Sequence, residues 1–307
     1  MSAKGGTRAI LAAFAANLGI AIAKFVGFIF TGSASMLSES IHSAADTGNQ
    51  GLLMLGHRRA RRAPDEDHAF GYARERYFWS FVVALVLFSL GALFSIVEGI
   101  DKVRHPHEID SVGWAFLILG VAIILESYSF RTAIVEAREH KATGVSWPGY
   151  IRSAREPELP VVLLEDLGAL IGLALAFGAL IVAEITGDAT WDGVGTLSIG
   201  VLLGFIAIVL AIEMKGLLIG EGATRDNVRK IKDAIGGSTD VLQLIHLRTQ
   251  HLGPEELLVG AKIQFRDDLD MKGLARAIDD TEARIRAVVP IARPMYIEPD
   301  ILHSPEA

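Results

Sequence analysis

Long runs of apolar residues, separated by short polar connections, are the feature that most limits how this chain can fold. The hydrocarbon core of a bilayer is roughly 30 Å thick, so a helix that crosses it needs about 20 mostly apolar residues. The chain has 307 residues, of which 51% are hydrophobic, and a mean hydropathy of +0.38. The runs of sufficient length predict six membrane-spanning helices, at residues 9–30, 34–55, 77–100, 112–130, 159–185 and 193–212.

The composition changes after Gly222, where mixed charged and apolar residues replace the long apolar runs. We therefore expect two domains, a six-helix membrane domain at residues 1–222 and a smaller cytoplasmic domain at residues 223–307. Hydrophobic periodicity in the second domain predicts helix, strand, strand, helix and strand, at residues 225–235, 241–250, 257–265, 272–289 and 294–298. This order favours a small α+β fold of the ferredoxin-like (αββαβ) kind. In its second helix, an apolar stripe is expected to face the sheet, formed by Leu274, Ile278, Thr281, Ile285 and Val288.

Basic residues gather in two of the connections between the predicted spans. The second connection contains six arginines and the fourth carries Arg138, Lys141, Arg152 and Arg155, whereas the first and fifth have no basic residue. The positive-inside rule places the basic connections in the cytoplasm, so both termini and the second domain are expected there too. The first span has no cleavage site after it and continues at once into the second, so we interpret it as a retained helix.

The second predicted span carries polar residues at spacings of three and four, which place them on one helix face: Ser35, Ser38, His42, Asp46 and Asn49. An ionised group near the middle of a bilayer costs about 2.5 to 3.5 kcal/mol or more, so these residues need either partners or a function. One interpretation is an internal hydrogen-bonded pair between His42 and Asp46 that helps helices to associate. The other is an ion-binding site.

Adjacent carboxylates in the fifth predicted span favour the ion-binding interpretation. Glu165 and Asp166 lie inside an otherwise apolar helix, where a cation would neutralise their repulsion. The chain has no cysteine, so imidazole and carboxylate are the ligands available to a metal. This ligand set suits zinc and, with less preference, manganese, iron(II), cobalt or nickel. Because these groups must be deprotonated to bind a metal, metal and protons are expected to exchange at such a site.

Other polar residues within the spans favour packing or ion pairing over ligation. Asn17 and Lys24 share one face of the first span, and Lys24 is expected either to pair with a carboxylate or to extend towards the membrane surface. Glu98 and Glu126 lie in the third and fourth spans.

These motifs together resemble the cation diffusion facilitators, over nearly the whole chain. The resemblance rests on the SxxxSxxHxxxDxxNQ pattern from Ser35, DEDHAFGYARERYFW from Asp65, LEDLGALIG from Leu164, and YIEP near the C-terminus. It implies a homodimer of six-helix protomers that exchanges a divalent cation for protons by alternating access. It also implies a tetrahedral cation site between the second and fifth helices, with His42, Asp46 and Asp166 as ligands. The Glu–Asp pair and the GYARERYFW stretch resemble the branch that contains the human zinc transporter nine.

The sequence departs from the common family pattern at Val162, where many members have a His or Asp four residues before the fifth-helix Asp. Valine cannot bind a metal, so the fourth ligand is expected to be Glu165, Asn49 or water. On an ideal helix Glu165 points about 100° away from Asp166. Metal identity is correspondingly open.

Two further groups of metal-binding residue types lie outside the spans. Asp65, Asp67 and His68 follow the second span, but contacts with lipid headgroups or ion pairs between subunits explain such a charged loop at least as well as a metal does. In the second domain His246 and His251, with the acidic residues Asp267, Asp268 and Asp270, are explained more simply as solvated surface groups.

The sequence thus predicts a zinc efflux transporter that exchanges the metal for protons, in a bacterial inner membrane, with the metal as cargo and no cofactor or nucleic-acid partner. Export of manganese, iron(II) or cobalt is the alternative within the same family. A membrane metal sensor would use the same ligands. A metal-dependent hydrolase, with Glu165 as base, would need an HExxH or comparable motif that the sequence lacks.

Overall fold

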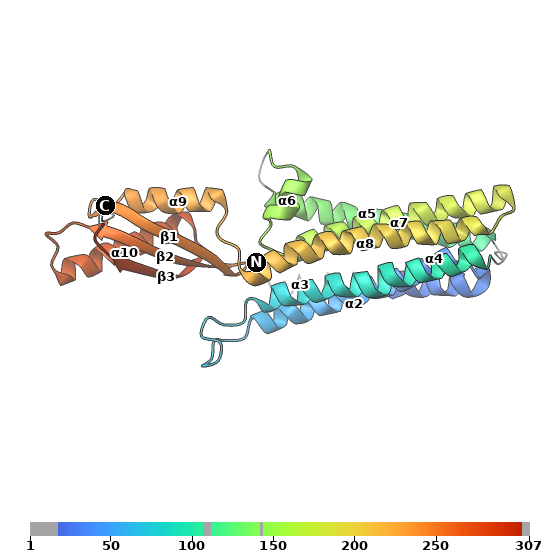
Figure 1. Cartoon of the computed structure of the whole chain (residues 1–307), viewed down its shortest axis with the longest axis horizontal. Coiled ribbons are helices and arrows are strands. Elements are labelled where there is room, and N and C mark those ends of the chain that lie inside the picture. The colour runs from blue at the N-terminus through green and yellow to red at the C-terminus, as the bar shows by residue number, and fades with distance from the viewer. Residues whose placement is uncertain (1–17, 107–111, 142–143, 303–307) are drawn as a thin grey trace, which may run out of the picture. The chain divides into compact units, whose positions relative to one another are not determined.

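The computed structural model describes residues 18–106, 112–141 and 144–302, and the chain divides into two compact units (Figure 1). The first unit contains the residues up to Arg59 together with Glu75–Lys215. The second contains Ala60–Arg74 and the residues from Gly216 onward. The division therefore falls a few residues before the predicted boundary at 222, and the connection after the second span groups with the C-terminal unit.

Long helices make up the first unit. In chain order they are Leu18–Thr31, α2 (Ala34–Ala60), α3 (Glu75–Val86), η1 (Leu87–Leu93), α4 (Phe94–Arg104), α5 (Val112–His140), α6 (Trp147–Ser153), α7 (Glu158–Thr186) and α8 (Thr190–Ile219). Four helical stretches among the described residues are long and apolar enough to cross a membrane, namely 75–104, 112–139, 158–186 and 190–219. These confirm the third to sixth predicted spans.

The first two predicted spans have different outcomes. The α2 helix is 27 residues long, enough to cross a bilayer, but its polar residues make it less apolar than the other four. The predicted span 9–30 begins outside the described residues, and its described part lies in the helix Leu18–Thr31.

A π-helical segment, η1, joins α3 to α4 within one continuous helical stretch. Such a segment inserts an extra residue into a turn and changes which side chains face the neighbouring helix. Here it turns Leu87, Gly91 and Ala92 inward, and Gly91 lies against the Leu203 side chain of α8. Sequence periodicity did not predict this change of helical pitch.

Glycines bring the backbones of α4 and α8 into direct contact. A Cβ atom on Gly99 would lie 2.7 Å from the backbone nitrogen of Leu197, and one on Gly193 would lie 2.8 Å from that of Val103. No side chain fits at such distances, so these positions depend on glycine. Close backbone approach substitutes in lipid for the hydrophobic drive that packs helices in water.

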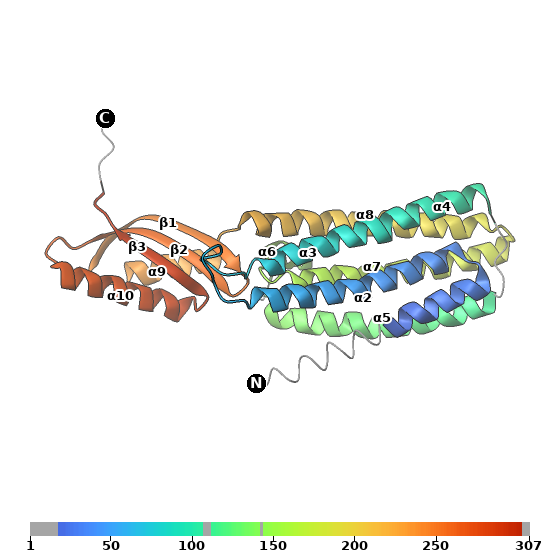
Figure 2. The ribbon, with the colours of Figure 1, turned by 90° about the horizontal axis from the view of Figure 1, so that it is seen from below.

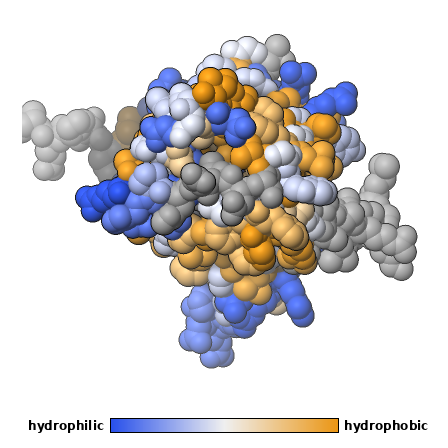
Figure 3. All heavy atoms as spheres, turned by 90° about the vertical axis from the view of Figure 1, so that its right-hand side faces the viewer, coloured by the Kyte–Doolittle hydropathy of each residue, from blue (hydrophilic) through white to orange (hydrophobic). Residues whose placement is uncertain are grey.

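The outer surface of this unit is largely apolar. Exposed hydrophobic side chains occur along the helices, for example Ile29, Leu117, Ile124, Phe205 and Ile212. In the end-on view of Figure 3, hydrophobic residues cover much of the visible surface. A surface of this kind requires a lipid environment, so the chain is a membrane protein.

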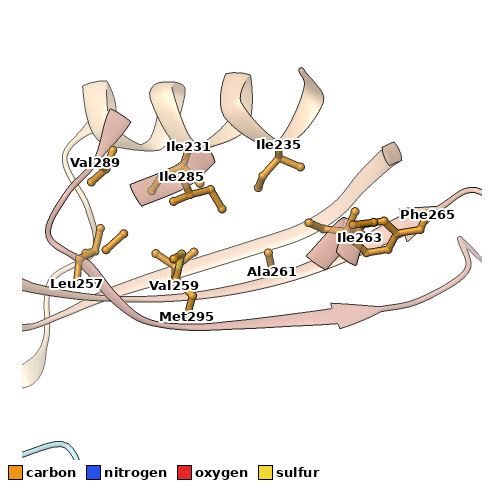
Figure 4. Packing of buried hydrophobic residues seen from close by; sticks show 12 residues of the cluster. Ile231, Ile235, Leu257, Val259, Ala261, Ile263, Phe265, Ile285, Val289 and Met295 are labelled. Atoms are coloured by element: carbon orange, nitrogen blue, oxygen red, sulfur yellow. The ribbon is translucent and has the colours of Figure 1, made fainter. Parts of the chain in front are cut away.

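The second unit has the predicted αββαβ order. Its elements are α9 (Arg225–Gly236), β1 (Val241–Gly253), β2 (Glu256–Phe265), α10 (Met271–Val288) and β3 (Ala292–Pro299). The strands form a sheet of order β1-β2-β3, in which β2 pairs antiparallel with β1 and parallel with β3 (Figure 2). Both helices cover one face of this sheet, and isoleucine, leucine and valine side chains fill the layer between them (Figure 4).

The apolar stripe of α10 is confirmed except at its last position. Thr281 and Ile285 are buried, while Leu274 and Ile278 are partly buried against the core. The prediction that Val288 faces the sheet is wrong, because 44% of its surface is exposed. Val289, just beyond the end of the helix, is buried in its place. The chain leaves helical geometry there, which shifts the inward-facing position by one residue.

Candidate metal centre

Polar side chains of α2 and α7 meet inside the first unit. His42 and Asn49 are fully buried, and Asp46, Glu165 and Asp166 are at most 9% exposed. The Asn49 amide donates a hydrogen bond of 2.5 Å from Nδ2 to Oε1 of Glu165. The carboxyl groups of Asp46 and Glu165 also lie within hydrogen-bonding reach of each other. Two carboxyl groups this close require a shared proton or a cation.

The imidazole of His42 faces the same group without a hydrogen bond of its own. Its Nδ1 lies 3.5 Å from Oδ1 of Asp46, and neither atom makes a hydrogen bond with a described residue. Nε2 of His42 and Oδ1 of Asn49 are likewise buried without one. A buried polar atom left in this way costs about 1 to 3 kcal/mol. The arrangement therefore favours an additional partner that accepts lone pairs, which a metal ion or a proton does.

Asp166 faces a different helix from Glu165. Its Oδ2 accepts a hydrogen bond of 3.0 Å from the hydroxyl of Ser129 on α5. Consecutive residues of a helix point about 100° apart, so Glu165 faces α2 while Asp166 faces α5. Of the two α7 carboxylates, it is Glu165 that lies beside Asp46 and Asn49.

The candidate ligands are not assembled as a coordination sphere in this conformation. Within the part of the chain that the structure describes, no three His, Asp or Glu side chains converge closely enough to hold a metal ion. One group is formed by His42, Asp46, Asn49 and Glu165. Asp166 is next to Glu165 in the chain but accepts its hydrogen bond from Ser129. Binding a cation to His42, Asp46 and Asp166 together would therefore need these side chains to come closer than they are here.

Val162 lies in an apolar cluster and not among the polar residues. It packs against Ala133 and Ala137 of α5 and Tyr150 of α6, together with Leu163. The position that supplies a ligand in many family members is here part of hydrophobic packing between helices.

A second buried polar group lies one turn before His42. Nζ of Lys24 is 3.2 Å from Oε2 of Glu39 and donates a hydrogen bond of 2.6 Å to Oγ of Ser43. Lys24 and Glu39 are both fully buried, so Lys24 pairs with a carboxylate and does not extend to the membrane surface. The α7 residue beside Glu39 is Gly172, where a Cβ atom would lie 2.6 Å from Oε1. The sequence patterns did not indicate a role for Glu39, although it lies three residues before His42 on the same helix.

The charged connection after α2 uses its candidate ligands locally. Asp65 lies 3.4 Å from Nδ1 of His68 and accepts hydrogen bonds from the His68 backbone and the Tyr72 hydroxyl. The Tyr72 hydroxyl lowers the pKa of Asp65 from its usual value. All three residues remain solvent-accessible, and their contacts are with one another inside the connection.

The histidines and acidic residues of the second unit are also dispersed. His246 is exposed and accepts a hydrogen bond from Arg248, whereas His251 is buried. Asp268 pairs with Arg266, which lowers the pKa of Asp268, and Asp270 caps the N-terminus of α10. These residues have structural roles, as solvated charges and a helix cap do in many domains.

Comparison with known proteins gives a consistent result. Residues 10–219 match the model of the cation efflux transmembrane domain. The mitochondrial proton-coupled zinc antiporter SLC30A9 of Homo sapiens is 32% identical over 271 residues, which is 88% of this chain and 47% of the human protein. Metal tolerance protein C4 of Arabidopsis thaliana is 30% identical over 85% of this chain and 58% of that protein. The magnetosome protein MamB of a Magnetospira strain is 24% identical over 90% of this chain and 91% of its own length. This chain spans about half of the length of the human relative.

Proposed function

The chain belongs to the cation efflux family, the cation diffusion facilitators, whose members transport metal cations and are not enzymes, and from this we propose that it exchanges zinc for protons. The proposed ligands are His42 and Asp46 of α2 with the α7 carboxylates Glu165 and Asp166. Asn49 holds Glu165 in place through its amide. We propose zinc for two reasons. Imidazole and carboxylate are suitable zinc ligands, and the relative SLC30A9 is named as a proton-coupled zinc antiporter.

The observation that carries this proposal is the burial of the Asp46 and Glu165 carboxyl groups beside an imidazole that makes no hydrogen bond with a described residue. Without a metal, two adjacent buried carboxyl groups need a proton between them. With a metal, that proton must leave, because a protonated carboxyl or imidazolium group has no lone pair to offer. Metal and proton therefore compete for the same atoms, which is the requirement for exchange.

Movement of Asp166 accounts for the open and assembled forms of such a site. In the conformation described here Asp166 bonds to Ser129 and faces α5. We propose that metal binding draws Asp166 from Ser129 towards Asp46, so that loading and release are coupled to a change in the α5–α7 contact.

A proton gradient is expected to drive zinc into proteoliposomes that contain the full chain. Vesicles with an acidic lumen should take up zinc faster than vesicles with equal pH on both sides, since outward proton flow then deprotonates and reloads the site. The measurement is lumenal zinc, followed with an entrapped fluorescent indicator. Dissipating the gradient with a protonophore is the control. Uptake that does not change with the imposed gradient would refute proton exchange.

Manganese, iron(II) and cobalt are the alternative cargoes, and the same assay distinguishes them when each metal is supplied alone. A metal sensor of the same family would bind the metal with the same residues while the vesicles stayed impermeable to it. Faster uptake of one metal than of the others would identify the substrate.

We further propose that the chain is a homodimer in a bacterial inner membrane, with its termini in the cytoplasm. Support for a dimer comes from the second unit, where Leu242 and Tyr296 expose more than half of their surfaces on the strands. Support for the orientation comes from the basic residues at the ends of α2 and α5. The measurement is the molecular mass of the purified protein by light scattering. A mass equal to that of a single protomer would refute the dimer.

A further inference from the structure

A cavity with two arginines opens between α5 and α7, and none of the candidate metal ligands lines it. Its volume is about 440 Å³, and it is lined by Ser127, Phe130, Arg131, Ile134, Val135, Arg138 and Leu170. Arg131 and Arg138 are seven residues apart on α5, which places them on one helix face. Both side chains are solvent-accessible in the described structure.

The two guanidinium groups of this cavity have no charged or hydrogen-bonded partner among the described side chains. Among the described residues neither Arg131 nor Arg138 makes a hydrogen bond or an ion pair with another side chain. Other arginines of this unit are engaged, such as Arg76, which forms two hydrogen bonds with Glu158. Two free cations in one cavity indicate an anionic ligand.

The position of the cavity along α5 corresponds to the edge of the bilayer. Arg131 lies 19 residues after Val112. At 1.5 Å per residue this is about 28 Å along the helix, close to the thickness of the hydrocarbon core. Exposed aromatic side chains at Trp114 and Tyr128 fit the two aromatic belts of a membrane protein. Arg131 therefore lies at the boundary of the hydrocarbon, and Arg138 lies in the headgroup layer.

Apart from Ser127, whose hydroxyl donates to the Ile123 carbonyl of its own helix, the remaining walls of the cavity are apolar. Phe130, Ile134 and Leu170 lie beside the arginines, so the cavity offers hydrocarbon contact and positive charge together. A soluble phosphate compound would gain nothing from the apolar walls. Arginine binds phosphate oxygens through its planar, two-pronged donor geometry. An amphiphile with a negatively charged phosphate headgroup satisfies both parts of the cavity.

We propose that the α5–α7 cavity binds an anionic phospholipid, with its phosphate group on Arg131 and Arg138 and an acyl chain along Phe130, Ile134 and Leu170. Ser129, which holds Asp166, lies two residues before Arg131 on the same helix. The bound lipid thus stabilises the α5–α7 contact close to the candidate metal centre. The proposal concerns lipid binding alone and does not depend on which cation is carried.

The test measures lipid retained by the purified full chain in detergent, by native mass spectrometry. Phosphatidylglycerol and phosphatidylcholine with identical acyl chains are added separately. Phosphatidylglycerol is expected to be retained preferentially, and the double variant Arg131→Gln/Arg138→Gln should lose this preference by about tenfold or more, since charge-assisted hydrogen bonds are removed. The matched control is Arg58→Gln/Arg152→Gln, which removes two exposed charges from the same end of the bundle outside the cavity.

Three outcomes would overturn the proposal. Equal loss in both double variants would mean diffuse attraction of anionic lipid to a positively charged surface. Equal retention of phosphatidylcholine by the native chain would mean that the headgroup charge is not recognised. Displacement of phosphatidylglycerol by inorganic phosphate at similar concentration would mean a site for free phosphate. Circular dichroism of each variant confirms that it remains folded.

Discussion

Replacing Asp46 by asparagine is expected to reduce zinc uptake into proteoliposomes by at least about 100-fold. Loss of residues that merely support a metal ligand typically costs 10- to 100-fold, so loss of a proposed ligand should cost at least the upper end of that range. The substitution keeps the size of the side chain but removes the charge that both a cation and a proton need. Lumenal zinc, measured under an imposed pH gradient, gives the result.

A matched substitution outside the site is the control for Asp46→Asn. Asp101 lies exposed near the end of α4, where it pairs with His105. The variant Asp101→Asn should transport at the native rate, since surface substitutions of this kind usually change stability by less than about 0.5 kcal/mol. Native uptake by Asp46→Asn would remove Asp46 from the proposed ligands.

The same assay separates the two α7 carboxylates. Glu165 faces Asp46 and Asn49, whereas Asp166 is held by Ser129. If both carboxylates bind the ion during the cycle, Glu165→Gln and Asp166→Asn should each impair uptake. Impairment by Asp166→Asn alone would assign Glu165 to a supporting hydrogen bond with Asn49.

The second unit could be predicted closely from sequence because its elements follow two simple periods. Strands alternate every two residues and helices every 3.6, and the observed bounds differ from the expected ones by at most three residues. The error at Val288 arose where the helix ends, because the period no longer determines which residue faces inward. The local sequence pattern therefore predicts where a helix or strand lies better than it predicts which residues of the last turn face inward.

In the membrane unit the sequence indicated which residues are costly but not which neighbours they meet. The spacing of His42, Asp46 and Asn49 predicted that they share one helix face, and all three are buried. It did not reveal that Ser129 of α5 would bind Asp166, since helical period defines a face but not the helix packed against it. For the same reason the sequence did not identify Glu39 as the carboxylate that pairs with Lys24.

Replacing Lys24 by methionine is expected to destabilise the protein by about 3 to 5 kcal/mol, the usual cost of leaving one member of a buried ion pair alone. Lys24 and Glu39 are fully buried and 3.2 Å apart, and the Lys24 ammonium also donates to Ser43. Methionine fills a similar volume without charge, so the effect should come from the Glu39 carboxylate, which would remain buried without its cationic partner. Thermal unfolding of the detergent-solubilised protein, followed by circular dichroism, measures it.

Neutralising both members of the pair should recover much of that loss. The double variant Lys24→Met/Glu39→Gln removes the charge that the single variant leaves uncompensated, and replacing both charges of a buried pair is often neutral or even stabilising. Lys215→Met, at an exposed position of α8, controls for the loss of a lysine as such. A double variant no more stable than Lys24→Met would mean that the two side chains are not energetically coupled. Recovery would mean that the pair stabilises α2 against the first helix, one turn from His42, and so fixes the position from which that imidazole faces Asp46.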